Sequence, residues 1–181
     1  MSPRSESSSE FDSYAGDYDT ALEQGISVRG DSKEFFARER LRWLKGRLQE
    51  TGFAPRRILD FGCGTGTATP FLIEAFQPDQ ILGVDVSAKS LEVARAEFGS
   101  DQVSFQLLTE ASPEATFDLA FCNGVFHHIP LDQRPGAASY VASSLRPGGR
   151  FARWENNPWS PAARIVMSRI PFDRDAIMVW P

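Results

Sequence analysis

Cysteines are few in this chain, and long apolar runs are missing. Cys63 and Cys122 are the only thiols among 181 residues, too few for the disulfide framework of many small secreted proteins. No run of about 18 apolar residues is present, and the N-terminal MSPRSESSSE lacks the apolar centre of a signal peptide. We therefore predict a cytoplasmic protein without a membrane segment.

Positive charge is also in short supply. The chain has 19 Lys and Arg against 24 Asp and Glu, a formal net charge of -5. Such a balance offers no general attraction to nucleic acid. Apolar residues make up 41% of the chain and aromatic residues 12%, which is ordinary for a globular domain and allows a substantial core at this length. We expect a globular protein whose partner is a small molecule.

The chain divides into three predicted parts. Residues 1–10 are rich in Ser and charge, which is typical of a disordered leader. Residues 11–54 hold the stretch FDSYAGDYD and then, after Asp31 or Ser32, a helical pattern with apolar residues at three- and four-residue spacing: Ala37, Leu41, Leu44 and Leu48. Residues 55–181 form the main domain.

Strand and helix patterns alternate along the main domain. Strands are expected at residues 56–61, 80–86, 103–108, 117–124 and 150–155, and helices at residues 67–76, 87–98 and 136–146. Alternation at this spacing implies crossover connections between parallel strands. The predicted fold class is therefore α/β, a Rossmann-like doubly wound, mostly parallel sheet with helices on both faces.

Alternating glycines follow the first predicted strand in ILDFGCGTGTATP. Gly62, Gly64 and Gly66 lie where such sheets bind ligands, and they allow a ligand to approach the backbone at the start of the next helix. A glycine-rich loop can also be only a tight turn. Asp85 ends the second strand, 25 residues beyond Asp60, where an acid accepts hydrogen bonds from ribose hydroxyls. Loop and acid together indicate an adenosine-containing ligand.

The glycine spacing bears on which ligand this is. Dinucleotide-binding sheets use G-x-G-x-x-G, in which the helix N-terminus holds a pyrophosphate. The chain has D-x-G-x-G-x-G instead, and Asp60 before the glycines disfavours further negative charge. A sulfonium that carries an amino-acid ammonium suits this loop better. An NAD-linked oxidoreductase is the alternative.

These motifs resemble those of the class I S-adenosylmethionine-dependent methyltransferases over Phe11 to Ile170. ILDFGCGTG looks like their first motif and GVDVS like their second-strand acid, while FDLAFCNGVFHHIP and LRPGGRF are similar to the fourth- and fifth-strand motifs. The resemblance implies an enzyme with S-adenosylmethionine as cofactor that transfers a methyl group to a small-molecule acceptor. It also implies that residues 11–54 form a helical cap over the cofactor.

The resemblance implies a set of cofactor-binding residues. Gly62, Gly64 and Gly66 would lie along the methionine part and Asp60 would face its ammonium group. Asp85 would hold the ribose, and Val86 would flank the adenine. The remaining candidates lie in the N-terminal segment, after the third strand and after the fourth: Tyr14, Tyr18, Thr109, Glu110 and Asn123.

Two departures from the family pattern are visible. An acid commonly follows the third strand directly, whereas here Leu108 precedes Thr109 and Glu110, either of which would contact the adenine. Members also normally continue to a sixth and a seventh strand, so we expect a core truncated at its C-terminus. The exposed edge of the fifth strand invites pairing with another chain, which would give a homodimer. A protein that binds S-adenosylmethionine without catalysis is a further alternative.

The catalytic candidates are His127 and His128, the only histidines in the chain. A histidine at the cofactor edge suits proton removal from the acceptor, although a structural role for the pair is the alternative. We predict no metal site.

Other residues have two open interpretations each. Those after the fifth strand either contact substrate or form an Asx-Pro turn: Glu155, Asn156, Asn157 and Trp159. Arg38 or Arg40 either reaches the cofactor carboxylate or belongs to a solvated face. Cys63 and Cys122 either approach each other or are separate buried thiols.

Overall fold

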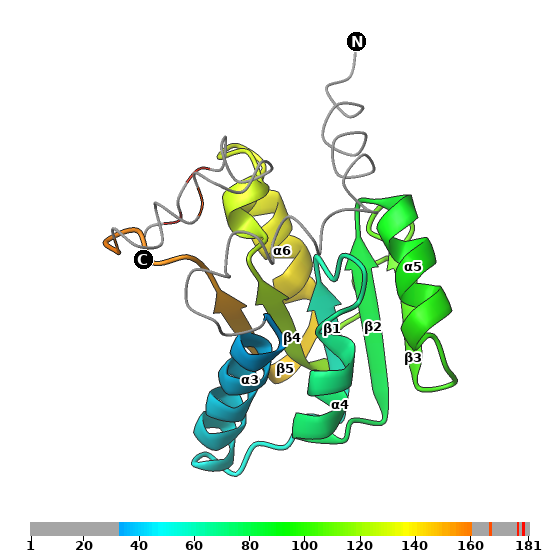
Figure 1. Ribbon diagram of the computed structural model, residues 1–181, viewed down its shortest axis with the longest axis vertical. Coiled ribbons are helices and arrows are strands. Elements are labelled where there is room, and N and C mark those ends of the chain that lie inside the picture. The colour runs from blue at the N-terminus through cyan, green and yellow to red at the C-terminus, as the bar shows by residue number, and fades with distance from the viewer. Residues whose placement is uncertain (1–32, 161–166, 168–176, 178, 180–181) are drawn as a thin grey trace.

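The computed structural model describes residues 33–160 and residues 167, 177 and 179; the candidates Tyr14 and Tyr18 lie outside them. Within them, one sheet has the strand order β3-β2-β1-β4-β5 with every pair parallel (Figure 1). The strands are β1 (Arg57–Phe61), β2 (Gln80–Asp85), β3 (Val103–Leu107), β4 (Phe117–Asn123) and β5 (Leu145–Trp154). The order reverses between β1 and β4, which confirms the predicted Rossmann-like fold.

Helices cover the two faces of the sheet unequally. The helical segments are α3 (Lys33–Gln49), α4 (Thr69–Phe76), α5 (Ala88–Phe98), η2 (Phe126–His128) and α6 (Arg134–Ser144). The first three share one core with the sheet, in which α3 lies beside α4 (Figure 1), and η2 and α6 contribute to the other. No helix of the described part is long and apolar enough to cross a membrane.

Local sequence signals account for several helix positions. Leu41, Leu44 and Leu48 are buried along one side of α3, as their spacing predicts. Pro70 lies in the first turn of α4, where it removes no helical hydrogen bond. The Ser87 hydroxyl accepts a hydrogen bond from the Ser90 N–H at 3.2 Å and so caps α5.

The start of β5 differs from the prediction. The strand begins at Leu145, five residues before the expected Arg150, and α6 correspondingly ends at Ser144. Leu145 already pairs with Phe117, and the register shifts between Phe117 and Leu119. Such an irregularity accommodates the Pro-Gly-Gly stretch within β5. The stretch therefore belongs to the strand and is not the turn between helix and strand. The domain boundaries at residues 10 and 54 stay predictions.

Candidate functional site

The glycine loop leaves β1 at the carboxyl edge of the sheet and contacts the end of β2. Gly62 and Cys63 donate their N–H groups to the Val84 carbonyl at 2.8 and 3.1 Å. Gly64 donates its N–H to Asp85 Oδ2 at 2.8 Å. The loop and the second-strand acid, separate in the sequence, are therefore directly bonded.

Protein packing explains two of the three glycines. A Cβ on Gly62 would lie 2.4 Å from Val125 Cγ2, and one on Gly66 would lie 2.9 Å from Phe98 Cδ2. Gly64 has a φ of 53°, and no atom of the described residues lies within 4 Å of an added Cβ. The space beside Gly64 is therefore where a ligand can approach the backbone.

Both carboxylate oxygens of Asp85 accept hydrogen bonds from backbone N–H groups. Oδ2 accepts from Gly64, and Oδ1 accepts from the Ser87 N–H at 2.9 Å. Each oxygen of a carboxylate has a second lone pair, so these bonds orient the group and leave it able to accept from a diol. Val86, next in the chain, is 41% exposed.

Asp60 is the most unusual acid of the site. It is 2% exposed, and its Oδ2 has no hydrogen-bond partner within the described part of the chain. Burial, with a smaller contribution from the negative charge of Asp85, raises the pKa of Asp60 to about 7. A buried carboxylate without a donor is costly, so this oxygen suits a cationic or hydrogen-bond-donating ligand.

The turn after β3 lies beside the end of β2. The Leu108 N–H donates to the Asp85 carbonyl at 2.8 Å, which holds the turn against β2. Thr109 and Glu110 follow and are both exposed. Either side chain is accessible to a ligand that extends past Asp85 and Val86.

On the other side of β1, Arg40 of α3 reaches the end of β4. Its Nη1 donates to Asn123 Oδ1 at 2.7 Å across 83 residues of sequence. Partial burial lowers the pKa of Arg40, and its hydrogen-bond partner is neutral. The structure therefore brings Arg40 to the site edge, whereas Arg38 pairs with Glu74 on α4.

The candidate base His127 has a carboxylate partner, Glu155, directly after β5. His127 Nδ1 lies 2.7 Å from Glu155 Oε2, and Glu155 Oε1 accepts the Phe126 N–H at 2.9 Å. The side chains of His127 and Glu155 are only 4% and 9% exposed. The His128 ring lies 4.0 Å from that of His127, centroid to centroid. Sequence reasoning missed this His–Glu pair.

The segment after Glu155 is a turn. Asn157 Oδ1 accepts the Trp159 N–H at 3.0 Å, and the Asn157 carbonyl accepts from Ser160 at 3.1 Å. This favours the Asx-Pro turn for Asn157. Trp159 is 64% exposed.

The two thiols lie on opposite faces of the sheet. Cys63 belongs to the core shared with α3, α4 and α5, and Cys122 to the core shared with η2 and α6. Both are free and buried, so they are separate buried thiols. Among the described residues, no group of three His, Cys, Asp or Glu is placed to hold a metal ion.

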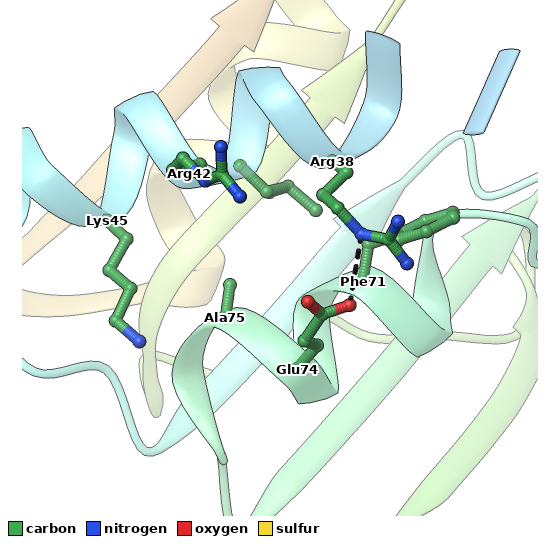
Figure 2. A pocket seen from close by; sticks show the side chains of 7 residues that line it. Arg38, Arg42, Lys45, Phe71, Glu74 and Ala75 are labelled. Carbon is green, nitrogen blue, oxygen red and sulfur yellow. Dashed lines mark hydrogen bonds and ion pairs between the residues drawn. The ribbon is translucent and has the colours of Figure 1, made fainter. Parts of the chain in front are cut away.

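A shallow hollow of ≈ 140 Å³ lies between α3 and α4 (Figure 2). Its rim carries Arg38, Arg42 and Lys45 from α3, and the Arg38–Glu74 ion pair of 3.3 Å crosses it. Arg38 also lies over the Phe71 ring at 5.4 Å. Its lining includes no residue of the glycine loop or the strand ends, so we do not place the reaction there.

Comparison with protein families gives a match to the methyltransferase domain over residues 59–151. Trans-aconitate 2-methyltransferase of Methylobacterium nodulans is 34% identical over 135 residues, 72% of this chain and 51% of that protein. Malonyl-[acyl-carrier protein] O-methyltransferase of Legionella pneumophila is 35% identical over 131 residues, 70% of this chain and 42% of that protein. The chain thus spans about half the length of these relatives.

Solved structures show the same fold. The DhpI–SAH complex superimposes with a TM-score of 0.60 at 25% identity, and covers 80% of this chain and 65% of that one. The DhpI–SAM–HEP complex gives a TM-score of 0.62 at 21% identity, over 84% and 65%. The family match over residues 59–151 includes the glycine loop and Asp85.

Proposed function

The chain belongs to the methyltransferase domain family, and on that premise we propose that it binds S-adenosylmethionine and methylates a small-molecule acceptor. Both relatives named above are methyltransferases, with a small acid in one name and a carrier-bound acid in the other. DhpI is a structural neighbour in complex with SAH. The proposed site is the carboxyl edge of β1, β2 and β4.

One observation carries the proposal: the buried Oδ2 of Asp60, at the start of the glycine loop, has no hydrogen-bond partner among the described residues. The proposed donor bears a sulfonium and an ammonium group, and either satisfies a carboxylate that lacks a protein donor. The chemistry of the site therefore fits the group.

The other residues have distinct proposed roles. Asp85, oriented by Gly64 and Ser87, accepts from the two ribose hydroxyls. Val86 covers one face of the adenine, and Thr109 or Glu110 contacts its amino group. When bound, S-adenosylmethionine supplies a methyl group on a positively charged sulfur. After transfer of the methyl group, this sulfur is a neutral thioether.

Arg40 and Asn123 complete the proposed donor site at its methionine end. A partly buried guanidinium whose partner among the described residues is an amide favours a carboxylate. The amino-acid carboxylate of the donor supplies one. Tyr14 and Tyr18 stay predicted contributors to closure of the site.

An NAD-linked oxidoreductase is the alternative, and Asp60 argues against it. A pyrophosphate beside a buried carboxylate would place like charges together, at a cost of several kcal/mol where water is excluded. Binding of the donor without turnover is the second alternative. Measurement of methyl transfer to a panel of acceptors distinguishes donor binding without turnover from catalysis.

The test is calorimetric titration of the purified chain with S-adenosylmethionine, S-adenosylhomocysteine and NAD. We expect micromolar dissociation constants for the first two and no detectable NAD binding. Binding of NAD alone would replace the proposal by the oxidoreductase. Binding of none would overturn it.

Three further predictions concern partners and location. We propose a small molecule as acceptor, with neither nucleic acid nor membrane as partner, and a cytoplasmic location. β5 pairs only with β4 within the described part, and its other edge offers a surface for a homodimer. Sedimentation velocity at several concentrations tests the homodimer.

A further inference from the structure

The buried pair of His127 and Glu155 has a geometry that determines where the imidazole proton lies. Glu155 accepts the Phe126 N–H with one oxygen, at 2.9 Å, and contacts His127 Nδ1 with the other, at 2.7 Å. Both of its oxygens are thus occupied by groups on one short turn. An ionised carboxylate only accepts hydrogen bonds, so a neutral His127 carries its proton on Nδ1 and its lone pair on Nε2.

The pair lies next to the proposed donor loop. The turn that holds His127 begins directly after β4, and its Val125 side chain fills the space beside Gly62. The Phe126 ring packs against Phe61 of β1, 6.1 Å between centroids. The His127 ring lies beside Gly124, whose added Cβ would be 3.6 Å from Cε1. The turn and the His127 ring therefore lie at the same sheet edge as Asp60 and Gly64.

Other charged or titratable side chains of the described residues lie near His127. None of them takes the place of Glu155 as the hydrogen-bond partner of His127 Nδ1. His128 faces the His127 ring at 4.0 Å. Arg153 of β5 lies over the Phe126 ring at 5.4 Å. The Cys122 thiol lies nearby, and burial, then Glu155 and Asp60, raise its pKa, so it stays protonated.

We propose that Glu155 is a positioning residue that holds His127 as the base for an acceptor whose nucleophilic atom carries a proton, such as a hydroxyl group. This inference rests on the proposed methyltransferase function and adds the acceptor class to it. A carboxylate acceptor is already ionised near neutral pH and needs no base. An imidazole oriented by a carboxylate suits an acceptor from which a proton must be removed.

The proposed step balances in atoms and charge. The acceptor oxygen forms a bond to the methyl carbon as the methyl–sulfur bond breaks, and the electron pair of that bond stays on sulfur. The acceptor proton passes to His127 Nε2. The resulting imidazolium is stabilised by the Glu155 carboxylate at Nδ1.

A structural role for Glu155 and a positioning role make different predictions for Glu155→Gln. Glutamine keeps the bond to the Phe126 N–H through its oxygen, so the turn stays in place. Its NH2 group donates to Nδ1, which moves the imidazole proton to Nε2. The variant therefore folds and binds donor but presents no lone pair to the acceptor.

The first experiment needs neither donor nor acceptor. Long-range ¹H–¹⁵N spectra of the full chain at pH 8 report the tautomer of each histidine, and His128→Gln assigns the two rings. We expect a protonated Nδ1 on His127 in the wild type and a protonated Nε2 in E155Q. A wild-type His127 with its proton on Nε2 would overturn the proposal.

The second experiment measures methyl transfer from radiolabelled S-adenosylmethionine to a panel of hydroxyl compounds and of carboxylates. We expect the hydroxyl compounds to be labelled. In E155Q we expect kcat to be lower by about 100-fold or more, with donor affinity unchanged. The matched control is Glu97→Gln, an exposed acid on α5.

The outcomes separate this inference from the proposed function. Labelling of carboxylates alone, of no compound, or of hydroxyl compounds equally by E155Q would overturn the inference while donor binding stands. Failure of the wild type to bind donor in the calorimeter would overturn the proposed function itself.

Discussion

The two halves of the carboxyl edge are built differently. The donor half, at the ends of β1 and β2, consists of backbone N–H groups and two acids, with Gly64 bonded to Asp85 at 2.8 Å. The second half, at the ends of β4 and β5, consists of side-chain pairs between distant residues: Arg40 with Asn123, assigned to the methionine end of the donor, and His127 with Glu155, assigned to the acceptor. The backbone-built half therefore suits a fixed ligand, whereas the surroundings of His127 can vary with the acceptor.

The largest expected effect comes from Asp85→Ala in the donor half. It removes the acceptor for the Gly64 N–H and for the ribose hydroxyls, so donor affinity should fall about 100-fold or more. Calorimetry with S-adenosylhomocysteine measures it. Asp101→Ala, at an exposed acid before β3, is the control and should change nothing. An unchanged affinity in D85A would place the ribose elsewhere.

Asp60→Asn should separate stability from binding. The wild-type carboxyl has a pKa of about 7 in the folded protein against 3.8 for the free group, so the folded state holds its proton more tightly. Its contribution to stability is thus complete below pH 3.8 and is lost as pH rises through about 7. The full difference corresponds to roughly 4 kcal/mol.

The variant carries no charge to bury, so its unfolding free energy relative to wild type should be higher at pH 8 than at pH 5. Urea unfolding at the two pH values measures this. Donor affinity should fall at least tenfold in the same variant, since a neutral amide attracts the cation less. Equal relative stability at both pH values would contradict the raised pKa of Asp60.

Gly64→Ala tests the open face of the loop. The residue has a φ of 53° and free space around an added Cβ, so the methyl group costs about 1 kcal/mol in backbone strain and occupies the space assigned to the ligand. We expect donor affinity to fall about tenfold with the His127 tautomer unchanged. Tight binding in this variant would show that no ligand lies against Gly64.

Arg40→Gln has the smallest expected effect. The amide can still bond Asn123, but the cation proposed for the donor carboxylate is lost. One charged contact at a partly exposed site should change the dissociation constant severalfold. Increasing salt should weaken donor binding in the wild type more than in the variant. If R40Q changes only the acceptor KM, Arg40 contacts the acceptor and the assignment to the donor carboxylate is wrong.

The donor half could be predicted from the sequence because its parts are local. Gly62, Gly64 and Gly66 follow a strand at a fixed spacing, and Asp85 ends the next strand of a parallel sheet, so topology alone brings them together. The fold followed from the same alternation of strands and helices. The missed start of β5 at Leu145 depends on a register shift with β4, which local patterns do not encode.

The half at the ends of β4 and β5 could be predicted only as a list of residues. The sequence indicates His127 and Glu155 separately, but their pairing depends on β5 lying next to β4 and on the turn that η2 makes. The sequence does not distinguish Arg40 from Arg38, and only the position of α3 across the sheet separates them. Residues joined across 28 and 83 positions leave no signal in a single sequence.

The most direct test of two separate halves is a parallel calorimetric titration of wild type, D85A and E155Q with S-adenosylhomocysteine. We predict that E155Q binds within about threefold of wild type, because Glu155 acts on the acceptor side, and that D85A binds about 100-fold more weakly or not at all. Equal losses in the two variants, or full affinity in D85A, would contradict the account.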